Sequence, residues 1–113
     1  MHEMGLTDAL LKMVDKIVAE EDVSGVNKIT LEIGNLSGVV PRFLKECWDA
    51  VAYGTAYQST ELVIKTVNGV ARCEDCKREF EADIDDLRCP YCRGFKLTPL
   101  TGRDMTILEI EAY

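Results

Sequence analysis

This chain of 113 residues lacks the features that mark several large classes of protein. No apolar run approaches the ~18 residues of a membrane-spanning helix, and there are no internal repeats, low-complexity tracts or long linkers. The first residues have neither the basic stretch nor the apolar core of a secretory signal. We therefore expect a cytoplasmic protein with no membrane partner, in which reduced cysteines act as metal ligands and do not form disulfides.

Basic residues are also scarce, because 13 Lys and Arg stand against 20 Asp and Glu, for a formal net charge of −7. Even residues 72–96, which hold most of the cysteines, carry six basic and seven acidic side chains. A protein that binds a phosphate backbone needs a basic surface. The composition therefore argues against DNA or RNA as a partner.

The chain does contain two segments with helical periodicity. Residues 6–18 predict an amphipathic helix that ends near residues 20–22. Its apolar stripe consists of Leu6, Ala9, Leu10, Met13, Val14, Ile17 and Val18. Pro41 can open a second helix, where its missing N–H is harmless, and Gly54 can close it. The apolar face of this second helix consists of Leu44, Cys47, Trp48 and Val51.

Three further segments, residues 28–33, 61–67 and 105–112, read as strands, and apolar side chains alternate along the first and the last of them. The predicted fold class is α+β, with a three-stranded sheet covered by two helices and a four-cysteine zinc-ribbon insert between the last two strands. We expect residues 1–70 plus 101–113 to form an α/β domain, and residues 71–100 to form a zinc-binding domain.

The least ambiguous motif is a pair of C-x2-C sequences separated by twelve residues. Its ligands are Cys73, Cys76, Cys89 and Cys92. Two pairs of thiolates joined by a short loop can converge on one ion, and a closed tetrathiolate set is typical of structural zinc. Mononuclear iron uses the same ligands. A dithiol oxidoreductase would need a C-x2-C that opens a helix, and the acidic Glu74 and Asp75 oppose a lowered thiol pKa.

Two details of the cysteine pattern carry their own predictions. Zinc-ribbon knuckles often have Gly directly after the second cysteine, whereas Lys77 and Arg93 occupy those positions here and Gly94 comes one residue later. We expect this difference to affect the turn geometry and not the ligands. The fifth cysteine, Cys47, lies on an apolar helix face and is predicted to be a buried thiol, not a further ligand.

The N-terminus holds the only histidine of the chain, His2. The amine of Met1, the backbone nitrogens of His2 and Glu3, and the His2 imidazole can form successive chelate rings. All-nitrogen tetragonal donor sets suit Ni(II) or Cu(II), whereas the Glu3 carboxylate is a weaker candidate. A lone histidine near a terminus is more often an exposed side chain without a ligand role, so this residue alone leaves both readings open.

Taken together, these residues resemble the HypA/HybF family of hydrogenase maturation nickel metallochaperones along nearly the whole chain. The matching elements are Met1-His2-Glu3, the helix over residues 6–18, the stretch 29–39 with its "IGxLSxV" pattern, Gly54-Thr55 before the strand at 62–64, both C-x2-C pairs, and Gly102-Arg103-Asp104-Met105, which is similar to "GrEL". Two departures are Met4-Gly5, where Gly5 can loosen the helix start, and Cys47, where an aromatic residue is frequent.

The resemblance implies a protein that is not an enzyme but carries Ni(II) as transient cargo to the large subunit of [NiFe]-hydrogenase, working with the GTPase HypB. It implies nickel binding through His2, with the Met1 amine and the Glu3 backbone as weaker candidates, in the α/β domain. Zinc in the four-cysteine site would be structural. We expect a monomer or a weak homodimer. The alternative reading is a zinc-ribbon adaptor that binds another protein complex or nucleic acid.

Overall fold

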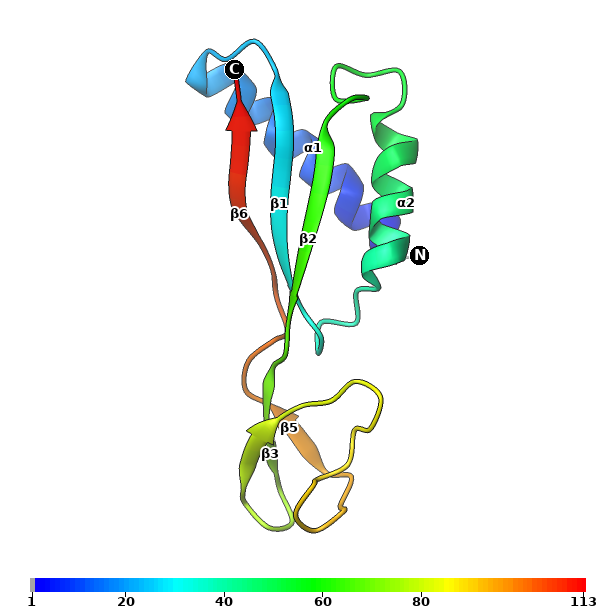
Figure 1. The fold of residues 1–113 in the computed structure, drawn as a ribbon, viewed down its shortest axis with the longest axis vertical. Helices are drawn as coiled ribbons and strands as arrows, with labels where there is room; N and C mark the ends of the chain where they lie inside the picture. Colours follow the sequence, from blue (N-terminus) through cyan, green and yellow to red (C-terminus); the bar gives the residue numbers. More distant parts are fainter. Residues whose placement is uncertain (1) are drawn as a thin grey trace. The chain divides into compact units, whose positions relative to one another are not determined.

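The computed structural model describes residues 2–113, with only the backbone of His2 included (Figure 1). Within these residues the chain forms two helices and six strands. In chain order they are α1 (His2–Glu21), β1 (Val26–Gly34), α2 (Pro41–Ala52), β2 (Glu61–Val67), β3 (Val70–Cys73), β4 (Glu79–Glu81), β5 (Leu97–Pro99) and β6 (Met105–Ala112). No helix within residues 2–113 is long and apolar enough to cross a membrane.

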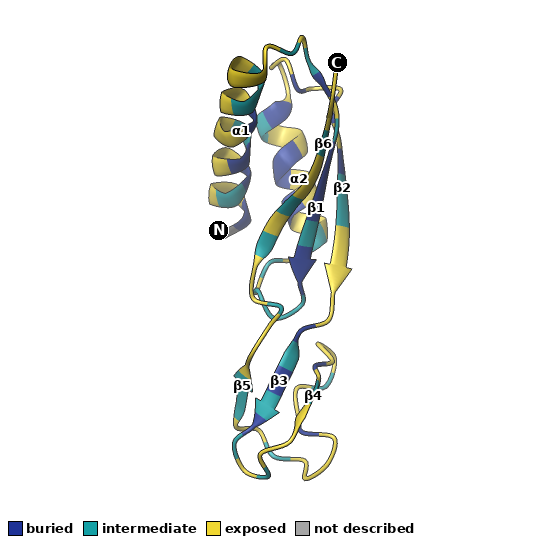
Figure 2. Ribbon diagram, turned by 90° about the vertical axis from the view of Figure 1, so that its left-hand side faces the viewer, coloured by how far each residue is buried: buried dark blue, intermediate teal, exposed yellow. Residues whose placement is uncertain are grey.

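The larger sheet has three strands in the order β2-β1-β6. Its strands β1 and β2 run in the same direction and β6 runs in the opposite one, and both helices lie on one face of the sheet (Figures 1 and 2). The parallel pair follows from the helix α2 between the two strands, because parallel strands need a crossover connection. The predicted α+β fold with two helices over a three-stranded sheet is confirmed.

The core of this layer comes from one face of β1 and one face of each helix. Ile29, Leu31 and Ile33 alternate along β1 and are at most 1% exposed. From α2, Leu44 and Trp48 are also buried, at 0% and 1% exposed. Burial of such large apolar side chains supplies about 1.5–3 kcal/mol each relative to leaving them exposed.

The first helix is longer than the sequence predicted and is rotated about its axis. It begins at His2, not near residue 6, so Gly5 does not interrupt it. Ala9 and Met13 of the predicted stripe are exposed. Leu10 and Val14 of the stripe are buried as predicted, and the polar residues Glu3 and Thr7 are buried as well. The Thr7 hydroxyl donates to the Met4 carbonyl at 2.9 Å, which satisfies this polar group inside the core.

The second helix begins at Pro41, as predicted, and Gly54 beyond its end has the left-handed φ of 76°. Val51 of its predicted apolar face is only half-buried, whereas Ala52 is buried. The loop after α2 is fixed to α1, because the Tyr57 hydroxyl donates to an Asp15 carboxylate oxygen at 2.5 Å. Burial and this carboxylate raise the pKa of Tyr57 to about 12.

The cysteine segment is built on a small antiparallel sheet in the order β4-β3-β5, in which Arg72 lies opposite Glu79 on one side and Thr98 on the other. The chain divides into two compact units. One comprises residues through Leu31 with Val39–Ile64 and Ile107–Tyr113, and the other comprises Glu32–Gly38 with Lys65–Thr106. The segment Glu32–Gly38 therefore belongs with the cysteine region although it begins within β1.

Asn35 explains why that segment belongs to the second unit. Its side-chain amide donates to the Ala82 carbonyl at 2.9 Å and to the Asn68 side chain at 3.2 Å. Its side-chain oxygen accepts from the Gly69 N–H at 2.8 Å. The Asn35 side chain thus forms hydrogen bonds with three residues that lie more than 30 residues away along the chain. Two of these bonds satisfy backbone groups, those of Gly69 and Ala82.

Candidate metal centre

The four sulfur atoms of Cys73, Cys76, Cys89 and Cys92 lie within 4.8 Å of one another. The sulfurs of Cys73 and Cys92 are 3.5 Å apart, and those of Cys76 and Cys89 are 3.6 Å apart. Each short distance thus joins a cysteine of the first pair to one of the second. No disulfide is formed, since all four residues are free cysteines. The sequence spacing therefore brings together the predicted set of ligands.

The two halves of the site are turns with the same backbone hydrogen bonds. In the first, the Lys77 N–H donates to the Cys73 carbonyl at 2.7 Å, and the Cys73 N–H donates to the Arg78 carbonyl at 2.9 Å. In the second, Arg93 and Cys89 form the equivalent bond at 2.8 Å. The Cys89 N–H also donates to the carbonyl of residue 94 at 2.9 Å. Both C-x2-C sequences therefore fold as zinc knuckles.

The positions that lack the usual glycine keep the glycine conformation. Lys77 has a φ of 66° and Arg93 has a φ of 64°, both in the left-handed region that side chains with a Cβ rarely adopt. The expected change of turn geometry does not occur; the chain retains the knuckle and accepts conformational strain at two residues. Gly94 has a separate role, because a Cβ there would lie 2.6 Å from an Asp75 carboxylate oxygen and 3.3 Å from the Cys92 sulfur.

Backbone N–H groups also point at the sulfur of Cys89. The N–H groups of Tyr91 and Cys92 both donate to this sulfur at 3.4 Å. Burial raises the pKa of the Cys89 thiol, but these N–H groups and the neighbouring thiols of Cys76 and Cys92 lower it, and the resulting pKa is about 7. Cys89 therefore carries negative charge more readily than Cys76 or Cys92 before a cation binds.

The thiols of Cys76 and Cys92 respond in the opposite direction. The Gly94 N–H lowers the pKa of Cys92, but the bond with Cys73 and burial raise it to about 12. The pKa of Cys76 is also raised, since burial and its thiol neighbours outweigh the N–H of Arg78. Several thiolates crowded together repel one another, so full deprotonation of this cluster requires a cation at its centre.

Charged side chains brace both knuckles from outside. Glu74 accepts from Arg72 at 2.9 Å, from Thr98 at 3.1 Å and from Lys77 at 3.4 Å. These donors, Arg72 first, lower the pKa of Glu74 to about 2.

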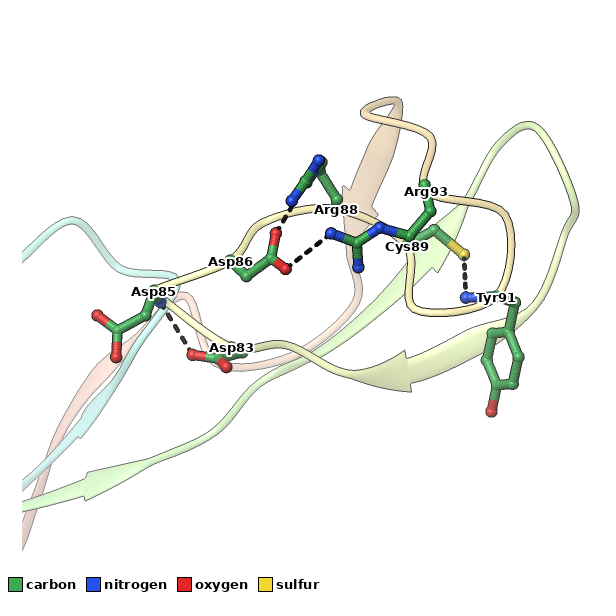
Figure 3. Close-up of polar contacts among 7 residues, drawn as sticks. All are labelled: Asp83, Asp85, Asp86, Arg88, Cys89, Tyr91 and Arg93. Carbon is green, nitrogen blue, oxygen red and sulfur yellow. Dashed lines mark hydrogen bonds and ion pairs between the residues drawn. The ribbon is translucent and has the colours of Figure 1, made fainter.

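At the second knuckle, Asp86 accepts from Arg88 and from Arg93, each at 3.0 Å, as Figure 3 shows. These contacts tie the residues next to the ligands to the sheet and to the loop before Cys89.

The site fits a tetrahedral ion. Four thiolates at about 2.3 Å from a zinc ion span edges of about 3.8 Å, close to the sulfur–sulfur distances of 3.5 and 3.6 Å and within the 4.8 Å that encloses all four sulfurs. All four positions are filled by the protein, so none is left for water or a substrate. The fifth cysteine, Cys47, is buried on α2 in the other compact unit and is not part of the cluster, which confirms the prediction of a buried thiol.

The second predicted site lies at the chain start. The Met1 amine and the His2 imidazole lie outside the described residues. The structure does place the His2 backbone at the first position of α1 and the Glu3 side chain, 6% exposed, against the core. The N-terminal segment is thus anchored one residue after the histidine.

Comparison with known proteins identifies the family. Residues 1–112 match the family described as "Hydrogenase/urease nickel incorporation, metallochaperone, hypA". The chain belongs to the HypA family. It is 35% identical over 112 residues to the hydrogenase maturation factor HypA of Streptomyces avermitilis, covering 97% of this chain and 86% of that protein. The HypA of Geotalea uraniireducens is 35% identical over 111 residues, and the match covers 98% of this chain and 98% of that protein.

Two solved structures share the fold. A solution structure of a HypA protein gives a TM-score of 0.69 at 17% identity and covers 100% of this chain and 97% of its own. The solution structure of the Ni metallochaperone HypA from Helicobacter pylori gives 0.66 at 16% identity, with 97% and 96% covered. The resemblance found from the sequence motifs is therefore confirmed. HypA proteins are metallochaperones for hydrogenase maturation and not enzymes.

Proposed function

We propose that this HypA protein binds Ni(II) at its N-terminus and delivers the ion for the maturation of [NiFe]-hydrogenase. The His2 imidazole is the principal donor, with the Met1 amine and the Glu3 backbone nitrogen as additional donors. The observation that carries the proposal is the family match over residues 1–112, since it assigns nickel incorporation to a chain with a single histidine.

The start of α1 at His2 supports this site on physical grounds. The first four N–H groups of an α-helix have no acceptor within the helix. The backbone nitrogens of His2 and Glu3 belong to this group, because α1 begins at His2. Nickel can therefore bind these nitrogens, after they lose a proton, at no cost in helix hydrogen bonds.

The position of Glu3 distinguishes its two donor groups. Its side chain is 6% exposed and lies against the core, so bringing its carboxylate to an ion at the terminus would require the first turn to leave the body of the protein. Its backbone nitrogen needs no such rearrangement. We therefore assign the backbone of Glu3, and not its carboxylate, to the nickel site.

The four-cysteine cluster is assigned to a structural zinc ion. Four thiolates suit zinc, and structural zinc sites bind with apparent free energies of about 10–16 kcal/mol. Such a site is unsuited to releasing cargo. In this proposal, residues 1–70 plus 101–113 form the domain that binds nickel, and residues 71–100 form the domain that binds zinc. Its check is elemental analysis: one zinc per chain supports it, whereas iron or no metal contradicts it.

Calorimetric titration with Ni(II) tests the N-terminal site directly. The His2→Ala variant should lose nickel binding while zinc content and circular dichroism stay unchanged. One Gly residue added before Met1 should weaken binding, because it removes the α-amine from the chelate. An undiminished affinity in His2→Ala would refute the site, and an unaltered affinity in the extended chain would remove the amine from the donor set.

Acidity gives an independent check of the histidine. Imidazole must be neutral to bind a metal, and its reference pKa is ~6.5. Nickel affinity should therefore fall as the pH drops through this region. An affinity that stays constant from pH ~7.5 down to ~5.5 would contradict ligation by His2.

Delivery requires partners, and we propose the GTPase HypB and the hydrogenase large subunit in the cytoplasm. The support is the maturation role of the family. Mixing the purified zinc-loaded chain with HypB and following the complex by light scattering tests the first contact. Transfer of radioactive nickel to the apo large subunit tests the second, with His2→Ala as the control that should not transfer.

A further inference from the structure

The strand β2 (Glu61–Val67) is an unprotected edge of the larger sheet. It pairs with β1 on one side and has no strand on its other side in the described structure. Most of its residues are exposed or half-buried, and it contains no proline and no positive φ. Natural edge strands are usually short, bulged or proline-bearing, because free N–H and C=O groups otherwise attract a second strand. This edge is seven residues long and has no proline. Charged side chains also protect edges, and here the strand carries one lysine.

One hydrogen bond shows which peptide groups of β2 are free. The Asn35 N–H donates to the Val67 carbonyl at 2.9 Å, so Val67 turns its peptide groups toward the β1 side. Successive residues of a strand turn their peptide groups to alternate edges. Val63 and Lys65 therefore also turn inward, whereas Leu62, Ile64 and Thr66 turn their N–H and C=O groups to the open edge.

The charged side chains along this edge are ordered so that two antiparallel copies of the strand would place opposite charges next to each other. The sequence reads Glu61-Leu62-Val63-Ile64-Lys65, with a negative charge at one end, a positive charge at the other and valine at the centre. Neither Glu61 nor Lys65 has an ion-pair partner among the described residues. We propose that β2 pairs antiparallel with β2 of a second copy of this chain, about a two-fold axis through Val63.

This register satisfies backbone and side chains together. Leu62 lies opposite Ile64 of the second copy, and these are the residues whose free N–H and C=O groups point outward, so they form hydrogen-bonded pairs. Glu61 then lies opposite Lys65 in a non-hydrogen-bonded pair, in which the Cα atoms approach to about 4.5 Å and the side chains meet most closely. The two-fold axis repeats this ion pair. The larger sheets of the two copies, each in the order β2-β1-β6, then join into one continuous sheet.

The helix beside the edge has the same kind of charge order. A cavity of about 350 Å³ lies between the first turn of α2 and residues 61–64, and Pro41, Arg42 and Lys45 line it from the helix side. Arg42 and Lys45 have no carboxylate within 4.0 Å among the described residues. Glu46 and Asp49 follow further along the helix. The two-fold axis runs the two copies of α2 antiparallel, so basic turns lie toward acidic ones.

Charge reversal tests the register, with the zinc-loaded, nickel-free full chain studied by sedimentation equilibrium. Wild type should dimerise reversibly. Glu61→Lys places lysine opposite lysine at both ends of the interface, and Lys65→Glu places glutamate opposite glutamate. Each should raise the dimer dissociation constant about tenfold or more, because favourable cross-strand pairs are replaced by repulsive ones. The double variant restores the complementary order and should regain the wild-type constant.

Both side chains are exposed, so circular dichroism and zinc content should not change in any of these variants. A wild-type chain that is monomeric at about 1 mM, single variants that dimerise as well as wild type, or a double variant that stays impaired would each overturn the proposal. None of these outcomes depends on nickel binding, so the proposed function is tested separately.

Discussion

The left-handed residue Lys77 allows the strain in the first zinc knuckle to be measured. Its φ of 66° costs a residue with a Cβ about 1–2 kcal/mol relative to glycine. Glycine in turn gives the unfolded chain extra entropy worth about 0.4–1 kcal/mol. The Lys77–Glu74 ion pair, 3.4 Å long and with the lysine side chain 69% exposed, adds little. Lys77→Gly should therefore stabilise the zinc-loaded protein by about 0.5–1 kcal/mol.

The matched control is Lys77→Ala, which removes the same ion pair but keeps the strained backbone. The comparison of Gly with Ala at this position isolates the conformational contribution. Because zinc binding is coupled to folding in such units, the gain should also appear as a two- to fivefold higher apparent zinc affinity, or about 0.5–1 kcal/mol. Competition with a chromogenic chelator measures it. If the glycine variant holds zinc no better than the alanine variant, the positive φ does not strain the knuckle.

Three further substitutions probe the described structure. Tyr57→Phe removes the 2.5 Å bond to Asp15 and should lower the free energy of unfolding by about 1–2 kcal/mol. The folded pKa of Tyr57 is raised to about 12, so this stabilisation is fully present below pH 10 and is lost as the pH rises toward 12. Denaturation measured across this range should therefore show that the free energy of unfolding falls more steeply in wild type than in the variant. Gly5→Ala adds a Cβ that meets nothing within 4 Å and should raise the denaturation midpoint by the equivalent of about 0.5–1 kcal/mol. Asn35→Ala leaves backbone groups of Gly69 and Ala82 unpaired and should cost about 1–3 kcal/mol by thermal unfolding of the zinc-loaded chain.

Much of the fold could be predicted because its strongest signals are local. The strands at residues 61–67 and 105–112 have the predicted bounds, and α2 begins at the predicted proline. In each case alternation or a fixed φ acts within a few residues. The cysteine cluster was predictable for the same reason, since spacing alone limits which sulfurs can meet around one ion.

The contacts that escaped prediction depend on distant partners. Glu3 and Thr7 are buried on α1 while Met13 is 49% exposed, because the direction in which the helix packs, and not its apolar content, selects its buried face. Thr7 is tolerated there because its hydroxyl bonds within the helix. The role of Asn35 is likewise invisible in sequence, since its three partners lie 33 to 47 residues further along the chain.

The cysteine cluster and the proposed nickel site differ in how far the fold arranges the donor groups in advance. At the cysteine cluster, the backbone already points two N–H groups at Cys89, and ion pairs at Glu74 and Asp86 hold both turns. These bonds hold the four thiols together as a preformed site, which suits a resident ion. At the proposed nickel site, the donors belong to the first residues of a helix, whose amides have no intrahelical partners to give up. Uptake and release of nickel then require only local rearrangement, which is what a carrier needs from its cargo site.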